Sequence, residues 1–243
     1  MKEHILVTLA KRQFLNVERE TVHLVDEPEI NAFLNDIEQY PHAYVLGCLM
    51  DCQMKSEKAF AIPWLVKESI GSFSINCLAD YSEEFYQNLF ISKNLHRFSN
   101  DKAKVFHVTV QRIANEYNGD ASKIWADNTS SAAVVYRFLQ FKGCGIKIAT
   151  MATNILARQF KIPLSDYYSI DISPDVHVDR VLKRAGLVSM EVSREAIIYK
   201  ARELNPEFPG IIDFSCWEIG RQFCKPQNPL CNQCPIQSEC KLF

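Results

Sequence analysis

Four cysteines near the end of the sequence have the type and spacing to bind a metal centre: Cys224, Cys231, Cys234 and Cys240, in the pattern C-x6-C-x2-C-x5-C. Several thiolates within one short loop suit a soft metal centre, because no long-range folding is needed to gather the ligands. Prolines within the loop stiffen it and lower the entropy lost when the ligands are fixed. The spacing favours an iron–sulfur cluster. A four-thiolate zinc site is an alternative, although only Cys231 and Cys234 form the C-x2-C pair typical of zinc.

A disulfide framework is a further alternative for these cysteines. The chain has 9 cysteines, an odd number, and we expect no signal peptide at its N-terminus. We therefore expect an intracellular protein without a set of structural disulfides. Cys48 and Cys52 lie four residues apart and are predicted to be two small buried residues rather than a metal pair.

The turn Phe141-Lys142-Gly143-Cys144-Gly145 is a second pattern that could do chemistry, because it directly precedes an expected helix. Two glycines one residue apart let a ligand approach the backbone closely and leave N–H groups accessible. The positive end of the following helix completes an anion site, and Lys142 adds a positive charge at its rim. A phosphate of a nucleic-acid backbone fits such a site. The alternative is a tight turn that binds nothing.

The composition is that of an ordinary globular protein. Of the 243 residues, 47% are hydrophobic and 23% are charged, and the formal net charge is -2. No apolar run is long enough to span a membrane. The net charge does not indicate a nucleic-acid binder, but residues 142–184 hold seven Lys or Arg against four Asp or Glu. A local basic face can bind phosphates on a near-neutral body, since charges act over about 10 Å in salt solution.

The elements that must position these residues are predicted to be helices, so the fold class is all-α. Apolar residues recur at helical spacing through most of the chain, and short turns with Asn, Gly or Pro separate the segments. Residues 1–25 are the exception, because the β-branched segments HILVTLA and ETVHLV indicate partly extended structure. The predicted helices cover residues 26–40, 41–53, 57–68, 83–92, 101–117, 130–141, 148–160, 174–186, 191–203 and 211–224.

Three of these segments together resemble a known family. The turn and helix FKGCGIKIATMATNIL resemble the helix-hairpin-helix of the endonuclease III superfamily of DNA glycosylases, whose turn reads L-P-G-V-G-R-K-T-A. The segment PDVHVDRV resembles that family's V-D-T-H-x-x-R-V, and the cysteine spacing matches its iron–sulfur loop. Further upstream, MDCQ resembles the family's L-S-x-Q, and NDKAKVFHVTVQRIANEYNGD resembles its N-S-K-A segment. The chain departs from the pattern at Phe141 and Lys142, and by an insertion around residues 163–172.

The resemblance implies a two-lobed fold with a [4Fe–4S] cluster held by the four cysteines. One predicted domain is a helical barrel over residues 41–158 that carries the hairpin. The other combines residues 1–40 with 159–243 and holds the cluster. The partner implied is double-stranded DNA with a damaged base or an abasic site, and we expect a monomer in the cytoplasm, associated with the nucleoid.

The resemblance also implies two catalytic residues for a DNA glycosylase with AP-lyase activity. Lys147 falls where the bifunctional members carry their nucleophilic lysine, and Asp175 matches the catalytic aspartate. The alternative for Lys147 is a contact to a DNA phosphate, and for Asp175 a helix cap without chemistry. A glycosylase without lyase activity and a non-catalytic DNA-binding module therefore remain open. Since Asp171 and Asp179 lie close in sequence, the assignment of the acid depends on the alignment.

Six further residues are predicted to contact DNA. Gln53 resembles the residue that fills the gap left by an extruded nucleotide, and aromatic residues such as Trp64, Tyr167 and Tyr168 are weaker candidates for stacking on the extruded base. The six predicted DNA-binding residues are Gln53, Lys142, Gly143, Gly145, His177 and Arg180.

Overall fold

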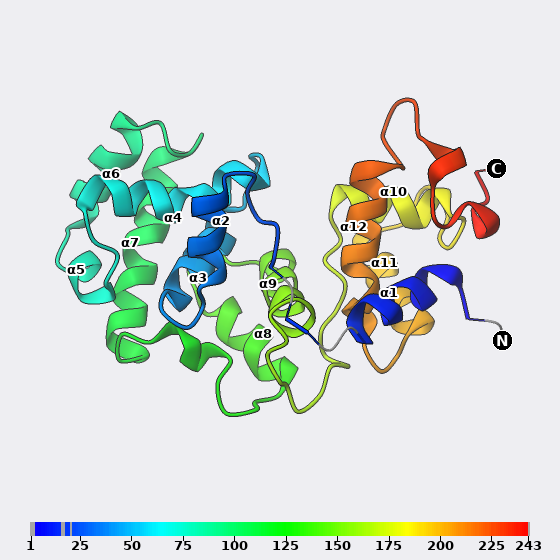
Figure 1. Ribbon diagram of the computed structural model, residues 1–243, viewed down its shortest axis with the longest axis horizontal. Coiled ribbons are helices and arrows are strands. Elements are labelled where there is room, and N and C mark those ends of the chain that lie inside the picture. The colour runs from blue at the N-terminus through cyan, green and yellow to red at the C-terminus, as the bar shows by residue number, and fades with distance from the viewer. Residues whose placement is uncertain (1–2, 16–17, 20, 243) are drawn as a thin grey trace. The chain divides into compact units, whose positions relative to one another are not determined.

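The computed structural model describes residues 3–15, 18–19 and 21–242 (Figure 1). All regular elements within these ranges are helices, which confirms the predicted all-α class. No helix among the described residues is both long and apolar enough to cross a membrane. The helices are α1 (Ile5–Leu15), α2 (Pro28–Asn35), α3 (Pro41–Met50), α4 (Ser56–Ile70), α5 (Ile75–Ala79), α6 (Glu83–Ser92), α7 (Ser99–Glu116), η1 (Ala121–Ile124), α8 (Ser131–Leu139), α9 (Ile146–Arg158), α10 (Val176–Arg184), α11 (Arg194–Leu204), η2 (Pro209–Ile212), α12 (Asp213–Gln222), η3 (Cys231–Gln233) and η4 (Gln237–Glu239).

The chain forms two compact units. Unit 1 comprises residues 1–20, 129–135 and 149–243, and unit 2 comprises residues 21–128 and 136–148. The helices α8 and α9 each contribute residues to both units. This division differs from the sequence-based one in where it places residues 21–40 and most of α9, and the predicted domain boundaries at 40 and 158 stay a prediction.

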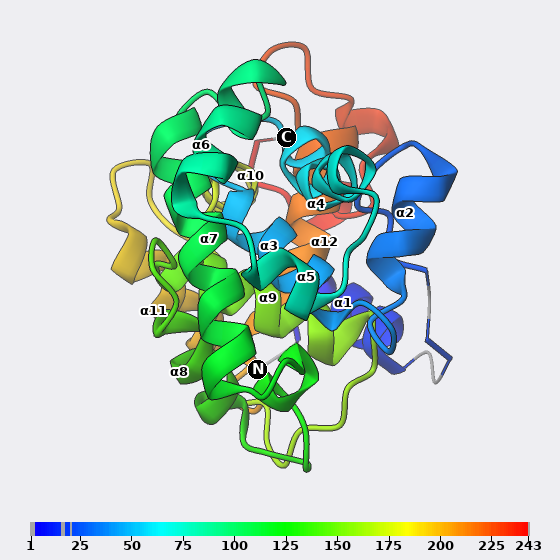
Figure 2. The same ribbon diagram turned by 90° about the vertical axis from the view of Figure 1, so that its left-hand side faces the viewer.

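Unit 2 is built around α3 and α7. Every residue of α3 is buried, as expected for a helix that is apolar on all sides. α7 buries one face, on which Val105, Phe106, Val110 and Ile113 recur at helical spacing. α6 packs against α7, and α4 packs against α3 (Figure 2). A fully buried α3 fixes whatever follows its last turn, which includes Asp51.

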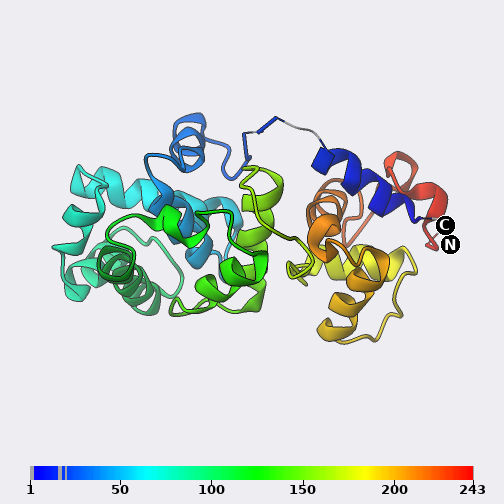
Figure 3. The same cartoon turned by 90° about the horizontal axis from the view of Figure 1, so that it is seen from below.

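Unit 1 packs α10 against α12, with α1 against α12 and η2 (Figure 3). The backbones of α10 and α12 approach closely, since a Cβ built on Gly220 would lie 2.7 Å from His177 Cβ. The backbone N–H of Ile5, at the start of α1, donates to Glu239 Oε2 at 2.8 Å. The N-terminal helix therefore helps to hold the cysteine loop at the other end of the chain.

The extended structure predicted for the segment HILVTLA was wrong, because residues 5–10 belong to α1. Leu6, Val7 and Ala10 are buried on one face of α1, and this packing overrides the strand preference of the β-branched residues. Residues 21–25 have no regular secondary structure, and Glu20 lies outside the described residues. The helix predicted to reach Gln53 ends at Met50, and α5 was not predicted.

Candidate active site

The turn between α8 and α9 needs a glycine at one position and leaves space at the other. Gly143 has φ +77°, and a Cβ built there would lie 3.2 Å from Val105 Cγ2. A Cβ on Gly145 would meet no atom within 4 Å, so its backbone is open to a ligand. The N–H of Cys144 donates to the carbonyl of Phe141 at 3.1 Å and closes the turn. Lys142 is exposed at this turn.

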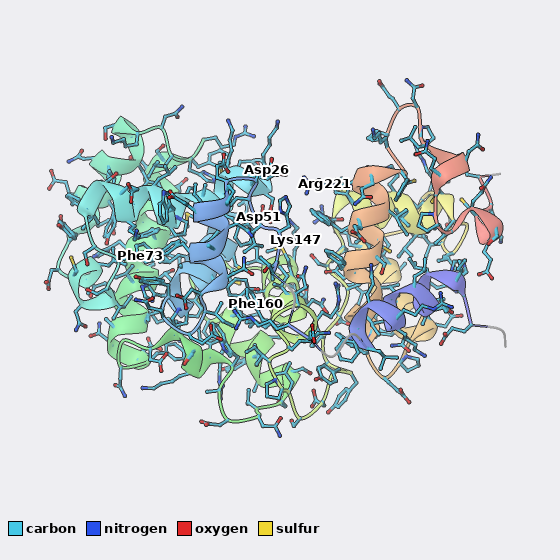
Figure 4. The ribbon with its side chains drawn as sticks, in the orientation of Figure 1. Asp26, Asp51, Phe73, Lys147, Phe160 and Arg221 are labelled. Carbon is cyan, nitrogen blue, oxygen red and sulfur yellow. The ribbon has the colours of Figure 1, made fainter. Side chains whose placement is uncertain are left out.

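Lys147 lies in the first turn of α9, directly after this turn. Its Nζ is 3.5 Å from Oδ2 of Asp51, a residue of the same unit (Figure 4). The Lys147 side chain is 44% exposed, whereas the Asp51 side chain is only 10% exposed. The ion pair therefore consists of the nearly buried carboxylate of Asp51 and the partly exposed side chain of Lys147.

The segment that carries Asp51 and Gln53 is anchored by cations from the start of α7. Lys102 is buried and donates from Nζ to the carbonyl of Leu49 at 2.7 Å. Arg97 donates from Nη1 to the carbonyl of Gln53 at 3.2 Å. Positive groups at the end of a helix are favourable, because the last carbonyls are unsatisfied and carry partial negative charge. Gln53 is exposed, with φ 53°, in the turn after α3 rather than within the helix.

The buried position of Lys102 affects its protonation. Burial lowers the pKa of Lys102, while Cys52, Asp51 and Cys144 act in the opposite direction. Burial also raises the pKa of the Cys144 thiol to about 12, with a smaller opposing effect from Lys102. Asp51 therefore lies in a group of buried polar side chains that already contains one lysine.

Asp175 is the N-cap of α10. Its Oδ1 accepts from the backbone N–H groups of His177 and Val178, both at 2.8 Å. The positive end of α10 also attracts the negative charge of the carboxylate. The helix-cap function considered from the sequence is therefore present, and it holds the carboxylate in a fixed orientation.

The two neighbouring aspartates have other partners. Asp171 accepts from Arg202 with both carboxylate oxygens, at 2.7 and 2.8 Å. Asp179 pairs with Lys183 at 2.8 Å, one helical turn further along α10. A carboxylate held by two donors of one guanidinium is poorly placed to act on a substrate. This arrangement favours Asp175 over Asp171 as the catalytic acid.

His177 and Arg180 make contacts inside unit 1. Arg180 donates from Nε to the carbonyl of Cys224 at 2.6 Å and from Nη2 to the carbonyl of Gly220 at 2.8 Å. Its Nη2 also lies 3.0 Å from Nδ1 of His177. These contacts join α10 to α12 and to the start of the cysteine loop, so both side chains support the fold. Their predicted contacts to DNA stay a prediction.

The four cysteines of the C-terminal loop line one cavity, together with side chains of α10 and α12. Arg184 lies at its wall and donates to Cys224 Sγ at 3.6 Å, to the Lys225 carbonyl at 2.6 Å and to the Pro226 carbonyl at 2.9 Å. Burial raises the pKa of the Cys234 thiol, a hydrogen bond from the Ile236 backbone opposes this, and Cys224, Cys240 and Cys231 raise the pKa by smaller amounts.

As they stand, no three His, Cys, Asp or Glu side chains in the described part of the chain form a group that could hold a metal ion. A [4Fe–4S] cluster is larger than a single ion and would take four Cys thiolates as its ligands. Four thiols that line a single cavity, with a guanidinium beside them, fit the larger group in ligand type and number.

Two of the aromatic candidates belong to packed clusters. Trp64 packs on Phe33 with ring centres 5.4 Å apart, and Lys67 Nζ lies 4.1 Å above its ring. Tyr167 is stacked on Phe208 at 5.1 Å. Tyr168 differs, because 62% of it is exposed.

Parts of the sequence are similar to known DNA-repair proteins. The chain is 32% identical over 105 residues to endonuclease III of Thermotoga maritima, which covers 43% of this chain and 45% of that protein. It is 35% identical over 72 residues to human adenine DNA glycosylase, which covers 28% of this chain and 13% of the relative. The chain thus spans less than half the length of the curated relatives it matches. No family model matches the sequence.

A solved structure shows the same fold. A non-covalent endonuclease III–DNA complex superposes with a TM-score of 0.63 at 20% identity, covering 98% of this chain and 92% of that one. The fold is therefore that of the helix-hairpin-helix DNA glycosylases. The chain is thus similar to endonuclease III in part of its sequence and in its fold.

Three residues of this site were missed from the sequence: Asp51, Arg97 and Lys102. The signal available for Asp51 was its position, as an acidic residue directly after the apolar helix α3. The sequence-based helix was predicted to continue through it. Neither cation could be assigned to the end of α3 without the tertiary structure, because about fifty residues separate them from it in the sequence.

Proposed function

We propose that this protein is a DNA glycosylase with AP-lyase activity that acts in base-excision repair. The observation that carries the proposal is the position of Lys147, a half-exposed amine directly after a turn whose open glycine backbone can accept a DNA phosphate. The substrate is double-stranded DNA with a damaged base or an abasic site. The target nucleotide leaves the helix so that its sugar becomes accessible.

Lys147 is the nucleophile in this proposal. Its Nζ, after losing a proton, donates its lone pair to C1′ of the deoxyribose, and the bond from C1′ to the base breaks. The electron pair of that bond leaves with the base, which takes up a proton. The C1′–O4′ bond then breaks as the sugar ring opens: O4′ keeps the electron pair and takes up a proton from the nitrogen, and the nitrogen lone pair forms the C1′=N bond of a protonated Schiff base. Loss of a proton from C2′ then expels the 3′ phosphate and cuts the strand.

Asp175 is the proposed carboxylate that stabilises the positive charge that develops on the sugar. Its two backbone hydrogen bonds occupy Oδ1 and fix the plane of the carboxylate, so little reorganisation is needed during the reaction. The predicted phosphate contacts of Lys142, Gly143 and Gly145 hold the strand while this happens.

Cys224, Cys231, Cys234 and Cys240 are the proposed ligands of a [4Fe–4S] cluster, for which the shared cavity is the support. The bound cluster would supply four metal–thiolate bonds that fix the loop. Arg184 and Arg180 hold the loop backbone to α10. Purified protein should contain about four irons per chain and absorb visible light; zinc without iron would contradict the assignment.

Borohydride trapping tests the lyase proposal. Wild-type protein incubated with duplex DNA containing an abasic site and borohydride should form a covalent adduct, because the hydride reduces the Schiff base to a stable amine. Lys147→Gln should form none. Lys93→Gln is the matched control, since it removes an exposed lysine of unit 2 to which no role in the site is assigned, and it should still be trapped. No adduct with the wild type, or an undiminished one with Lys147→Gln, would contradict the proposal.

A glycosylase without lyase activity is the second candidate, and the similarity to adenine DNA glycosylase favours it. In that case Lys147 would bind a phosphate through its ammonium. Release of free base from lesion-containing duplexes, with no strand cleavage and no trapped adduct, would identify this activity. Binding to abasic duplex without either reaction would instead indicate a non-catalytic DNA-binding module.

A further inference from the structure

The Lys147 amine has a carboxylate partner within unit 2 that the proposed reaction has not yet used. Asp51 Oδ2 lies 3.5 Å from Lys147 Nζ. The two residues come from separate segments, since Asp51 follows α3 and Lys147 begins α9. A lysine side chain has four rotatable bonds and loses much conformational freedom when its end is held. A fixed partner for Nζ therefore strongly restricts where the amine can be.

Asp51 is itself held rigidly. Its side chain is 10% exposed, and it follows a helix that is buried along its whole length. Its backbone N–H donates to the carbonyl of Cys48 at 3.2 Å. On either side of it, the carbonyls of Leu49 and Gln53 accept from Lys102 and Arg97. The carboxylate thus has little freedom to follow a moving lysine.

Lys147 is not needed to balance the charge of Asp51. The buried Lys102 already interacts electrostatically with this carboxylate. An ion pair with a half-exposed lysine adds little to stability, because water screens the exposed partner. The main effect of the contact is therefore to restrain the Lys147 amine, and its contribution to the stability of the fold is small.

We propose that Asp51 is a positioning residue that holds the Lys147 amine in place for attack on C1′, an inference that rests on the proposed function. Attack requires the nitrogen to lie close to the reacting carbon in the correct direction, and misplacement by about 1 Å can lower a rate about 100-fold. Asp51 supplies the restraint from a rigid helix end, and Lys147 supplies the reacting nitrogen.

Substitution of Asp51 tests the inference. Asp51→Asn keeps the size of the side chain, and Asp51→Glu keeps the charge but moves it by one methylene group. Glu83→Gln is the control, since it breaks another lysine–carboxylate pair of unit 2, with Lys104 at 3.8 Å. Each variant is measured for melting temperature, for affinity to a duplex with a tetrahydrofuran abasic analogue, and for the single-turnover rate of borohydride trapping at saturating protein.

The trapping rates are compared on the plateau of each variant's pH profile, so that a change in protonation is not taken for a change in position. We expect Asp51→Asn to be trapped about 10- to 100-fold more slowly, with affinity for the analogue within about twofold of wild type. Asp51→Glu should be intermediate, and Glu83→Gln should match the wild type.

The outcomes separate the inference from the proposed function. Wild-type trapping together with full-rate trapping of Asp51→Asn would overturn the positioning role and leave the lyase proposal intact. A loss of affinity or folding in Asp51→Asn that accounts for its whole loss of rate would show a structural role and also overturn the inference. Absence of trapping by the wild type would overturn both.

Discussion

The cap and the catalytic charge of Asp175 can be separated by substitution. Asp175→Asn keeps a side-chain oxygen that can accept from the N–H groups of His177 and Val178, and asparagine is a good N-cap residue. Asp175→Ala removes the acceptor altogether. Both variants therefore lose the charge, but only Asp175→Ala also loses the helix cap.

The magnitudes follow from these contacts. Loss of an N-cap costs about 0.5–2 kcal/mol, and two hydrogen bonds at 2.8 Å from a charged acceptor favour the upper half of that range for Asp175→Ala. For a chain of this length each kcal/mol corresponds to about 2–4 °C in melting temperature. Asp175→Asn should lie within about 0.5 kcal/mol of the wild type. Loss of a preorganised charge should lower the rate of base release or trapping about 100- to 1,000-fold in both variants.

The assays are urea denaturation, single-turnover trapping, and amide hydrogen exchange at His177 and Val178. Both amides should lose protection in Asp175→Ala and keep it in Asp175→Asn. Asp179→Asn is the matched control, because it removes a nearby carboxylate that is paired with Lys183, and it should keep full activity. An Asp175→Asn variant as active as wild type would refute the catalytic role, and leave Asp175 as a helix cap.

Three further predictions concern the turn and the cysteines. Gly143→Ala should destabilise the protein by about 1–2 kcal/mol and weaken DNA binding, because φ is +77° and the new Cβ would lie 3.2 Å from Val105 Cγ2; denaturation and affinity measurements check this. Cys231→Ser should lower the iron content and visible absorbance, whereas Cys77→Ser, outside the cavity, should not; equal iron in both would exclude Cys231 as a ligand. The Cys144 thiol should react with iodoacetamide at pH 8 about 1,000-fold more slowly than an ordinary thiol, because burial raises its pKa from 9.0 to about 12; rapid labelling, read by mass spectrometry, would contradict this.

Features that depend on neighbouring residues could be predicted from the sequence. The four cysteines of the loop lie within 17 residues, from Cys224 to Cys240, so any compact loop brings them together. Helical periodicity predicted α6 and located most of α7, because a single buried face repeats along each helix. The turn at Gly143 could also be predicted from neighbouring residues, because its conformation depends on glycine at that position.

The errors arose where tertiary packing overrides local preference. The segment HILVTLA has the β-branched residues of a strand, but it forms α1 because Leu6, Val7 and Ala10 bury one helical face against η2 and α12. The helix predicted to reach Gln53 stops at Met50, and Lys102, from the first turn of α7, donates to the carbonyl of Leu49 there.

The sequence by itself determined the helical class, the cysteine loop and the turn before α9, because each depends on residues close together in the chain. Only the tertiary structure decided which carboxylate lies beside Lys147, and which of Asp171, Asp175 and Asp179 has a guanidinium partner. Asp51 and Lys147 are 96 residues apart, and no periodicity or spacing relates them. Such a pair forms because α3 is buried within unit 2, which places the end of that helix beside the start of α9.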